Sequence, residues 1–464
     1  MPNRGGCKKA LFILLPVLSV FVLEAAAWAA ASSVSANASP AIAVPEVAAP
    51  SASRGAAGAP PLVLDELIGE ALEHNPGLAA YKFKAEADER RIPQQKSLPD
   101  PMVSVGYQNE GWDRYSFGDR QMSMWNFAAS QTFPYPGKLG LKGKVAESRA
   151  ASDMESWEAM RLRVVRQVKD LYYDLFYYYK GLDIIAARRG LFTQMENAAL
   201  ARYSSGLAPQ EEVILAQTEK YTLLEKQQTL DQKIKAAEAK LNSVLGRPVA
   251  GPLGKPGQTE YVLDAGTSAP LIQAALSNSP DIRADAEMVE GARAGVELAK
   301  KQYYPDFTVT GQVSKRAGDF MDIWSLTTAV NVPLFYRTKQ REGVKEAEAL
   351  QRAAEANLEA ARLSLSSEIE NYFAIQQTAG NLMKLYREGL VPKTYQDFEA
   401  ALSGYVTGKV PALTAIDRLK TLLDFEFRYW EQFVERQKAL ASVEAITGKT
   451  GWIRLRAANG PGGI

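Results

Sequence analysis

Two short stretches decide the fold: residues 203–209, with the sequence YSSGLAP, and residues 405–411, with the sequence YVTGKVP. Both read Tyr-x-x-Gly-x-x-Pro, and they lie 202 positions apart. Each stands between two segments rich in good helix formers. A glycine that ends one helix and a proline that starts the next predict a tight helical hairpin at both places.

Further landmarks recur in the same order on either side of these hairpins. LIGEALEHNP at 67–76 resembles LIQAALSNSP at 271–280, and Leu-Pro-Asp at 98–100 resembles Tyr-Pro-Asp at 304–306. The offset between equivalent landmarks stays between 202 and 206 residues. A constant offset over several landmarks indicates an internal tandem duplication.

The duplication predicts the domain organisation. The first structural repeat covers residues 62–248 and the second covers 268–449. A segment rich in Gly and Pro, 249–267, links them.

The ends of the chain differ from the repeats in composition. Basic residues precede an apolar run at 10–23, and small residues follow it, which predicts a secretory signal peptide over residues 1–30. Residues 31–61 are mostly Ala, Ser, Pro and Gly and predict a disordered leader. Residues 450–464 form a C-terminal tail.

Composition excludes several classes of function. The 54 Lys and Arg residues balance 53 Asp and Glu residues, so a nucleic-acid binder, which needs a basic surplus, is disfavoured. The chain has one Cys and one His, so Cys/His metal sites and catalysis are nearly excluded. No phosphate-binding loop or nucleophile elbow is present. We therefore expect no enzyme, no catalytic residue, no cofactor and no bound metal.

Each repeat predicts the same order of elements, which makes the fold mainly α with a small β part. A helical stretch comes first, then two short strands, a very long helix and a return helix. The first helical stretches are 65–91 and 269–302, the long helices are 140–204 and 340–404, and the return helices are 210–245 and 412–446. A proline should interrupt the second long helix at 389–392.

The strands show a period of two. Residues 307–314 and 324–332 alternate apolar with small polar residues, and 103–107 and 125–129 do so less regularly. A small sheet with one apolar face and two open edges is an aggregation risk in water and is not permitted in lipid. Closure with strands of other subunits removes the edges, with lipid outside and a polar lumen inside.

Aromatic residues cluster beside these strands. At strand ends they could form the girdles that sit at membrane interfaces. They would serve equally well in the core of a soluble sandwich, and the pattern alone does not separate the two. The aromatic residues are Trp112, Tyr115, Phe117, Trp125, Phe133, Tyr135, Phe320, Trp324, Phe335 and Tyr336.

Together these features resemble the TolC-type outer-membrane factor family over residues 62–449. LPDP at 98–101 and FPYPGK at 133–138 look like its heavy-metal-efflux branch. The resemblance implies a homotrimer with a 12-stranded β-barrel in the bacterial outer membrane, to which each chain gives four strands. A long α-helical barrel would continue it into the periplasm, with the linker in an equatorial belt. The implied partners are outer-membrane lipid, a periplasmic adaptor and an inner-membrane pump.

The resemblance also carries functional positions onto this sequence. The hairpins would dock the adaptor, and acidic positions after them would form rings that narrow the pore. The docking positions are Tyr203, Ser204, Ser205, Gly206, Leu207, Tyr405, Val406, Thr407, Gly408 and Lys409. The aperture positions are Glu211, Glu212, Thr414 and Asp417. The family has an acidic residue near Thr414, and this departure weakens the expected charge of the gate.

The implied function is the passive exit channel of a tripartite efflux pump. The duct of a type I protein secretion system would fit the same features. A soluble periplasmic coiled-coil adaptor or scaffold would share the signal and the hairpins, but it would not need a strand pair with an apolar face in each repeat. The cargo does not follow from the sequence, although the likeness to the metal branch favours metal ions.

Overall fold

The computed structural model describes residues 61–263, 265–448 and 453–455. The expected signal peptide, nearly all of the expected leader and most of the expected tail lie outside the described residues. The elements of the first repeat are α1 (Leu64–His74), α2 (Pro76–Lys96), β1 (Met102–Gln108), β2 (Met124–Phe133), α3 (Lys138–Ser204) and α4 (Gln210–Val244). Those that follow are β3 (Tyr261–Leu263), α5 (Ala269–Asn278), α6 (Pro280–Lys301), β4 (Asp306–Lys315), β5 (Ile323–Asn331), α7 (Gln340–Leu385), the π-helical turn η1 (Tyr386–Leu390), α8 (Val391–Val406), α9 (Ala412–Thr447) and β6 (Ile453–Leu455).

The first helical stretch of each repeat is divided, which the sequence analysis did not predict. Asn75 separates α1 from α2, and Ser279 separates α5 from α6. Each is followed by a proline, and a proline disfavours the helical conformation in the residue before it. The Asn75 side chain also accepts a hydrogen bond from the N–H of Leu78 at 2.8 Å and so caps α2. The sequences Asn75-Pro76 and Ser279-Pro280 could therefore have predicted both breaks.

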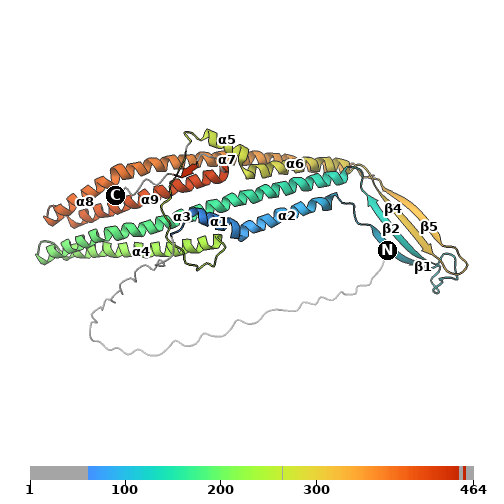
Figure 1. Ribbon diagram of the computed structural model, residues 1–464, viewed down its shortest axis with the longest axis horizontal. Helices are drawn as coiled ribbons and strands as arrows, with labels where there is room; N and C mark the ends of the chain where they lie inside the picture. Colours follow the sequence, from blue (N-terminus) through green and yellow to red (C-terminus); the bar gives the residue numbers. More distant parts are fainter. Residues whose placement is uncertain (1–60, 264, 449–452, 456–464) are drawn as a thin grey trace, which may run out of the picture. The chain divides into compact units, whose positions relative to one another are not determined.

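Two long antiparallel hairpins carry most of the helical residues (Figure 1). In the first, α4 packs back along α3, which has 67 residues and is about 100 Å long at 1.5 Å per residue. In the second, α9 packs back along α7 and α8. A helix of this length needs lateral packing, because propensity alone does not hold it.

The predicted interruption of the second long helix is confirmed. Pro392 has no N–H to donate, and the chain takes a π-helical turn over Tyr386–Leu390 just before it. The Thr394 hydroxyl then donates to the Leu390 carbonyl at 2.7 Å. The chain therefore stays helical through the interruption, as α7, η1 and α8 follow one another directly.

Three apolar clusters hold the helices together. The first lies in the half of the hairpins nearer their turns and includes Phe192, Met195 and Phe398. The second joins α1, α3, α4 and α9 through side chains such as Tyr172, Phe176, Leu241 and Phe433. The third packs α5 against α7 and α9. Among the described residues, no helix carries an apolar run long enough to cross a membrane.

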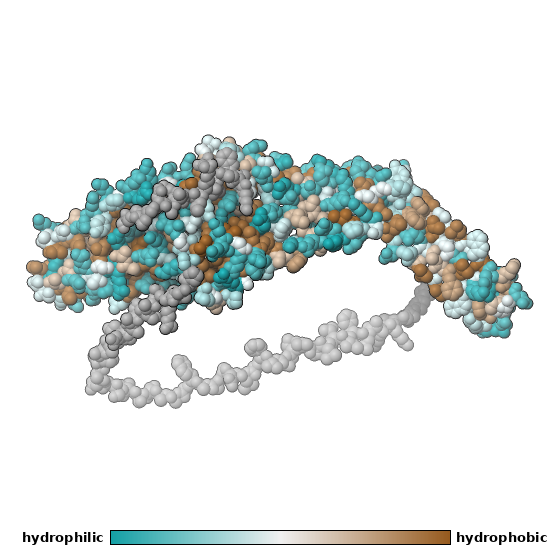
Figure 2. All heavy atoms as spheres, in the orientation of Figure 1, coloured by the Kyte–Doolittle hydropathy of each residue, from teal (hydrophilic) through white to brown (hydrophobic). Residues whose placement is uncertain are grey.

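The four strands form one antiparallel sheet in the order β1-β2-β4-β5. The pairing register places Val105 opposite Phe127, Phe127 opposite Val313 and Val313 opposite Trp324. One face is therefore apolar across all four strands, as the period of two predicted. Figure 2 shows hydrophobic residues gathered over these strands.

The opposite face of the sheet is polar. The hydroxyls of Thr132 and Thr308 are hydrogen-bonded at 2.9 Å, and the Ser314 hydroxyl donates to Asn126 Oδ1 at 2.7 Å. Strand β5 forms one edge, and all nine of its residues are exposed. Strand β1 forms the other edge, and six of its seven residues are exposed.

Aromatic side chains stack at both ends of the apolar face. At the end next to the helices, Phe133 stacks on Phe307 with 5.5 Å between ring centroids, and Tyr135 stacks on Tyr304 at 4.5 Å. At the far end, the ring centroid of Tyr107 lies 4.9 Å from that of Tyr115 and 5.2 Å from that of Trp125. Two aromatic layers thus bracket the strands.

A second, two-stranded sheet joins the linker to the tail. Strand β3 pairs with β6 in antiparallel register, with Tyr261 opposite Leu455. Neither strand was predicted, because each has three residues and forms only through a contact between distant parts of the chain.

Gly181 is expected to be essential for the packing of α3 against α4 and α9. A Cβ at this position would lie 2.9 Å from Cε1 of Phe427 and 3.0 Å from Cδ1 of Leu230. We expect Gly181→Leu to destabilise the fold by about 1–3 kcal/mol through overpacking. Gly190→Leu, in the same helix but with open space around it, should gain up to about 1 kcal/mol from helix propensity. Thermal unfolding followed by circular dichroism distinguishes them, and equal melting temperatures would contradict the packing.

Candidate docking tips and aperture

The first tip is the turn between α3 and α4. Gly206 has a positive φ of 70°, which favours glycine, and the Leu207 N–H donates to the Arg202 carbonyl at 2.8 Å. The Ser204 and Ser205 hydroxyls both donate to the Ala201 carbonyl at 2.9 Å. The backbone carbonyls of Ala201 and Arg202 near the end of α3 thus accept hydrogen bonds from the turn itself. The Leu207 side chain is 70% exposed at the tip.

The second tip, between α8 and α9, repeats this geometry. Gly408 has a φ of 77°, and the Lys409 N–H donates to the Gly404 carbonyl at 2.8 Å. The Thr407 hydroxyl donates to the Ser403 carbonyl at 3.1 Å. Val406 presents an apolar side chain that is 60% exposed. Both predicted hairpins are therefore present, each with an exposed apolar residue at its turn.

The equivalent tyrosines of the two tips differ in environment. Tyr203 is 44% exposed, whereas Tyr405 is fully buried. The burial of Tyr405 comes from the first hairpin, because the Arg202 guanidinium carbon lies 4.9 Å from the centroid of the Tyr405 ring. The internal duplication is thus asymmetric at its most exposed end.

Arg202 ties the two tips together, a role that the sequence analysis did not predict. Its Nη1 donates to the Tyr405 carbonyl at 2.6 Å, and its Nη2 donates to the Leu207 carbonyl at 3.1 Å. One guanidinium thus bridges the turn of the first tip and the C-terminal end of α8, where a cation is favoured by the helix dipole. The sequence offers no signal for this contact, because the partners are 203 residues apart.

Glu212 forms a second link between the hairpins. The Tyr405 hydroxyl donates to Glu212 Oε2 at 2.9 Å. Burial, and then this hydrogen bond, raise the pKa of Tyr405 to about 12. Since an ionised tyrosine cannot donate, the link is present below pH about 10 and is lost as the pH rises toward 12.

The other expected aperture residues lie near the start of the return helices, with Glu211 in the first turn of α4, Thr414 in the first turn of α9 and Asp417 in the second. Glu211 and Asp417 are exposed, and Thr414 is partly buried. The structure brings Glu212 to the second tip but does not test whether the four residues form rings, so the aperture stays a prediction.

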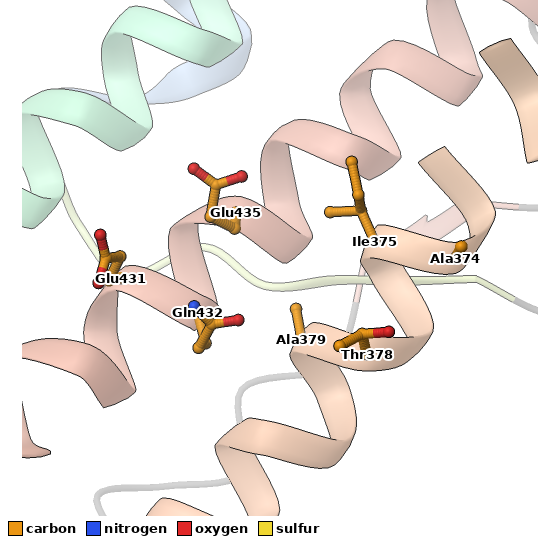
Figure 3. Close-up of a pocket in the computed structure, with 7 residues that line it drawn as sticks. All are labelled: Ala374, Ile375, Thr378, Ala379, Glu431, Gln432 and Glu435. Atoms are coloured by element: carbon orange, nitrogen blue, oxygen red, sulfur yellow. The ribbon is translucent and has the colours of Figure 1, made fainter. Parts of the chain in front are cut away.

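An acidic groove farther from the tips was also missed by sequence reasoning. A cavity of about 470 Å³ lies between α7 and α9, and the side chains of Glu431, Gln432 and Glu435 line its α9 side (Figure 3). Asp170 of α3 lies near Glu435, and its pKa is raised chiefly by burial. Its Oδ1 is buried and has no hydrogen-bond partner among the described residues. Glu431 and Glu435 are four residues apart in the sequence. This spacing did not predict a groove, because it is usually found on a helix face that is exposed to solvent.

Metal ligands are not grouped in the part of the chain that the structure describes. No set of three or more His, Cys, Asp or Glu side chains there is arranged to hold an ion. The chemistry available at the tips and in the groove is therefore hydrogen bonding and charge.

The geometry agrees with a known family. The family described as outer membrane efflux protein matches residues 67–247 and 271–449, one match in each repeat. The chain therefore belongs to the outer membrane efflux protein family, whose place is the bacterial outer membrane. Family and fold are those of channel proteins rather than of enzymes.

Individual proteins support this assignment. The cobalt-zinc-cadmium resistance protein CzcC of Cupriavidus metallidurans is 22% identical over 85% of this chain and 92% of its own length. The structure of CusC aligns with a TM-score of 0.71 at 17% identity, covering 83% of this chain and 92% of CusC. That of VceC from Vibrio cholerae aligns with a TM-score of 0.69 at 18% identity, covering 83% and 96%. The resemblance and the fold class expected from the sequence are confirmed.

The Arg202 link gives a testable difference between two arginines. Arg202→Met keeps the aliphatic stem but removes both hydrogen bonds, which are worth about 1.5–3 kcal/mol when a donor is charged. We expect hydrogen exchange of the amides at 405–409 to accelerate about tenfold or more. The control is Arg418→Met, which breaks a half-exposed ion pair to Asp397 at 3.0 Å and should change exchange little. Equal protection in both variants would show that Arg202 does not hold the tips.

Proposed function

We propose that three copies of this chain form the exit duct of a tripartite efflux pump. In this arrangement the three sheets close into a 12-stranded β-barrel in the outer membrane, and the hairpins form an α-helical barrel in the periplasm. The observation that carries the proposal is the sheet itself, which has an apolar, exposed face and two unpaired edges.

The dimensions of the strands support a membrane span. Strands of nine or ten residues, such as β4 and β5, extend about 30 Å at 3.4 Å per residue. Tilted by about 45°, they suit the thin apolar band of an outer-membrane barrel. The two aromatic layers lie where headgroups would be, which favours the girdle interpretation over a soluble sandwich. The polar face, with Asn126, Thr308 and Ser314, then lines the lumen.

The tips support contact with a periplasmic adaptor. Leu207 and Val406 are large apolar residues exposed at turns that are otherwise satisfied by their own hydrogen bonds. Exposed apolar groups on a rigid frame favour docking of another protein. In a closed state, the bonds from Arg202 and Tyr405 would hold the two hairpins of each copy together, and Glu211, Glu212, Thr414 and Asp417 would surround the aperture.

Adaptor docking is tested with a photo-crosslinker at Val406 in the native host. We expect a trimer in the outer-membrane fraction that crosslinks to a periplasmic adaptor identified by mass spectrometry. Leu207→Ser removes an apolar contact worth about 1.5–3 kcal/mol, so capture should fall about tenfold. Leu200→Ser, in the last turns of α3 before the tip and 53% exposed, is the matched control. A chain found in the soluble fraction would overturn the duct, and unchanged capture in Leu207→Ser would overturn the docking site.

For the cargo we propose divalent metal cations. The supporting facts are the name of CzcC, which describes cobalt, zinc and cadmium resistance, and the acidic groove lined by Glu431 and Glu435. Carboxylates along a duct attract cations and raise their local concentration. The inner-membrane pump would supply the energy.

A growth assay tests the cargo. Deleting the gene should lower tolerance to Co²⁺, Zn²⁺ and Cd²⁺ and leave tolerance to toluene unchanged. Glu431→Gln combined with Glu435→Gln should restore metal tolerance less well than the wild type, whereas Glu225→Gln, an exposed glutamate of α4, should restore it fully. Loss of toluene tolerance alone would assign the duct to organic cargo.

A further inference from the structure

A second cavity lies where the sheet meets the helices. It has a volume of about 430 Å³. It is lined by the start of α3, the end of α6, the start of β4, the end of β5 with the residues that follow it, and the start of α7. Leu334 and Phe335 line it and are each 76% exposed. Lys339 lines it as well, is exposed and makes no ion pair within the described residues. The cavity therefore combines an apolar wall, the ion pair between Lys138 and Asp306 at 2.8 Å, and the free cation of Lys339.

One polar atom in this cavity lacks a partner. Gln340 Oε1 is buried, yet no described residue donates a hydrogen bond to it. A buried acceptor without a donor costs about 1–3 kcal/mol. The cavity thus calls for an occupant that brings an N–H group, an apolar side chain and a negative charge.

Strand direction indicates which segment that is, and this step rests on the proposed trimer. The strands alternate in direction from β1 to β5, so β1 of the next copy would lie beside β5 and antiparallel to it. The residues that precede β1 in that copy then lie beside the residues that follow β5. Those residues are Leu98–Pro101, which connect α2 to β1.

The chemistry of Leu98–Pro101 complements the cavity. Leu98 is 48% exposed, and Asp100 is exposed and makes no ion pair within the described residues. Because Pro99 and Pro101 have no N–H, the segment can offer only the amides of Leu98 and Asp100. The Pro99 carbonyl already accepts a hydrogen bond from Gln131 Nε2 at 2.8 Å, which fixes the segment against its own sheet.

We propose that Leu98–Pro101 of one copy fills this cavity of the next copy. Leu98 packs against Leu334 and Phe335, the Asp100 carboxylate pairs with Lys339, and a backbone N–H of the segment satisfies Gln340 Oε1. Three such contacts seal the wall of the duct at the level where the strands give way to helices.

Disulfide formation tests the contact. In a Cys7→Ser background, which has no other cysteine, Leu98→Cys is combined with Leu334→Cys. The two edges of one sheet are three strand spacings apart, about 14 Å, which is too far for a disulfide within one copy. We expect oxidation to give reducible dimers and trimers on denaturing gels. Leu98→Cys with Leu350→Cys, 61% exposed on α7, should give none.

The outcomes separate this contact from the trimer. Amine-reactive crosslinking of the same membranes reports the trimer independently. A crosslinked trimer without the Leu98–Leu334 disulfide, or with a disulfide inside single chains, would overturn the contact and leave the duct standing. No trimer in the Cys7→Ser parent would overturn the duct itself.

A charge exchange checks the ion pair without cysteines. Asp100→Lys alone should lower the temperature at which the detergent-solubilised trimer dissociates, and Asp100→Lys with Lys339→Asp should restore it. Dissociation at the same lowered temperature in the single and double variants would contradict the pairing of Asp100 with Lys339.

Discussion

The unpaired backbone groups along β1 and β5 are the constraint on which the structure depends. Each edge strand offers N–H and C=O groups that no strand of the same sheet can satisfy. The apolar face of the sheet faces lipid in the proposed trimer, and lipid supplies no hydrogen bonds to an open edge. Closing three sheets into one barrel pairs β5 of each copy with β1 of the next. Symmetry, membrane insertion and the seam at Leu98–Pro101 all follow from that pairing.

The helices extend this arrangement into a tube whose far end is held by few bonds. Along most of their length, α3, α4, α8 and α9 are joined by apolar packing. At the tips, by contrast, Arg202 and the pair Tyr405–Glu212 connect the two hairpins. Hydrogen bonds can exchange with water or a partner at lower cost than a packed core can be opened. Such an end suits a gate, whereas the packed middle suits a rigid wall.

Much of the fold could be predicted because its signals are local. The repeat of Tyr-x-x-Gly-x-x-Pro predicted both hairpins, and the alternation of apolar and small polar residues predicted the four strands. Pro392 predicted the interruption near η1. The strands β3 and β6 could not be predicted, since each exists only through the other. The two tips were correctly predicted to be turns. The bridge from Arg202 to Tyr405 could not be predicted, because it depends on how the two repeats pack against each other. The burial of Tyr405, and not of Tyr203, has the same origin.

The central claim is that β5 of one copy pairs with β1 of another. Electron cryo-microscopy of the purified protein in lipid nanodiscs tests this most directly. The account predicts particles with threefold symmetry, a closed barrel of 12 strands, four from each copy, and continuous density between β5 and the neighbouring β1. A monomer, or an assembly in which either edge strand stays unpaired in lipid, would contradict it.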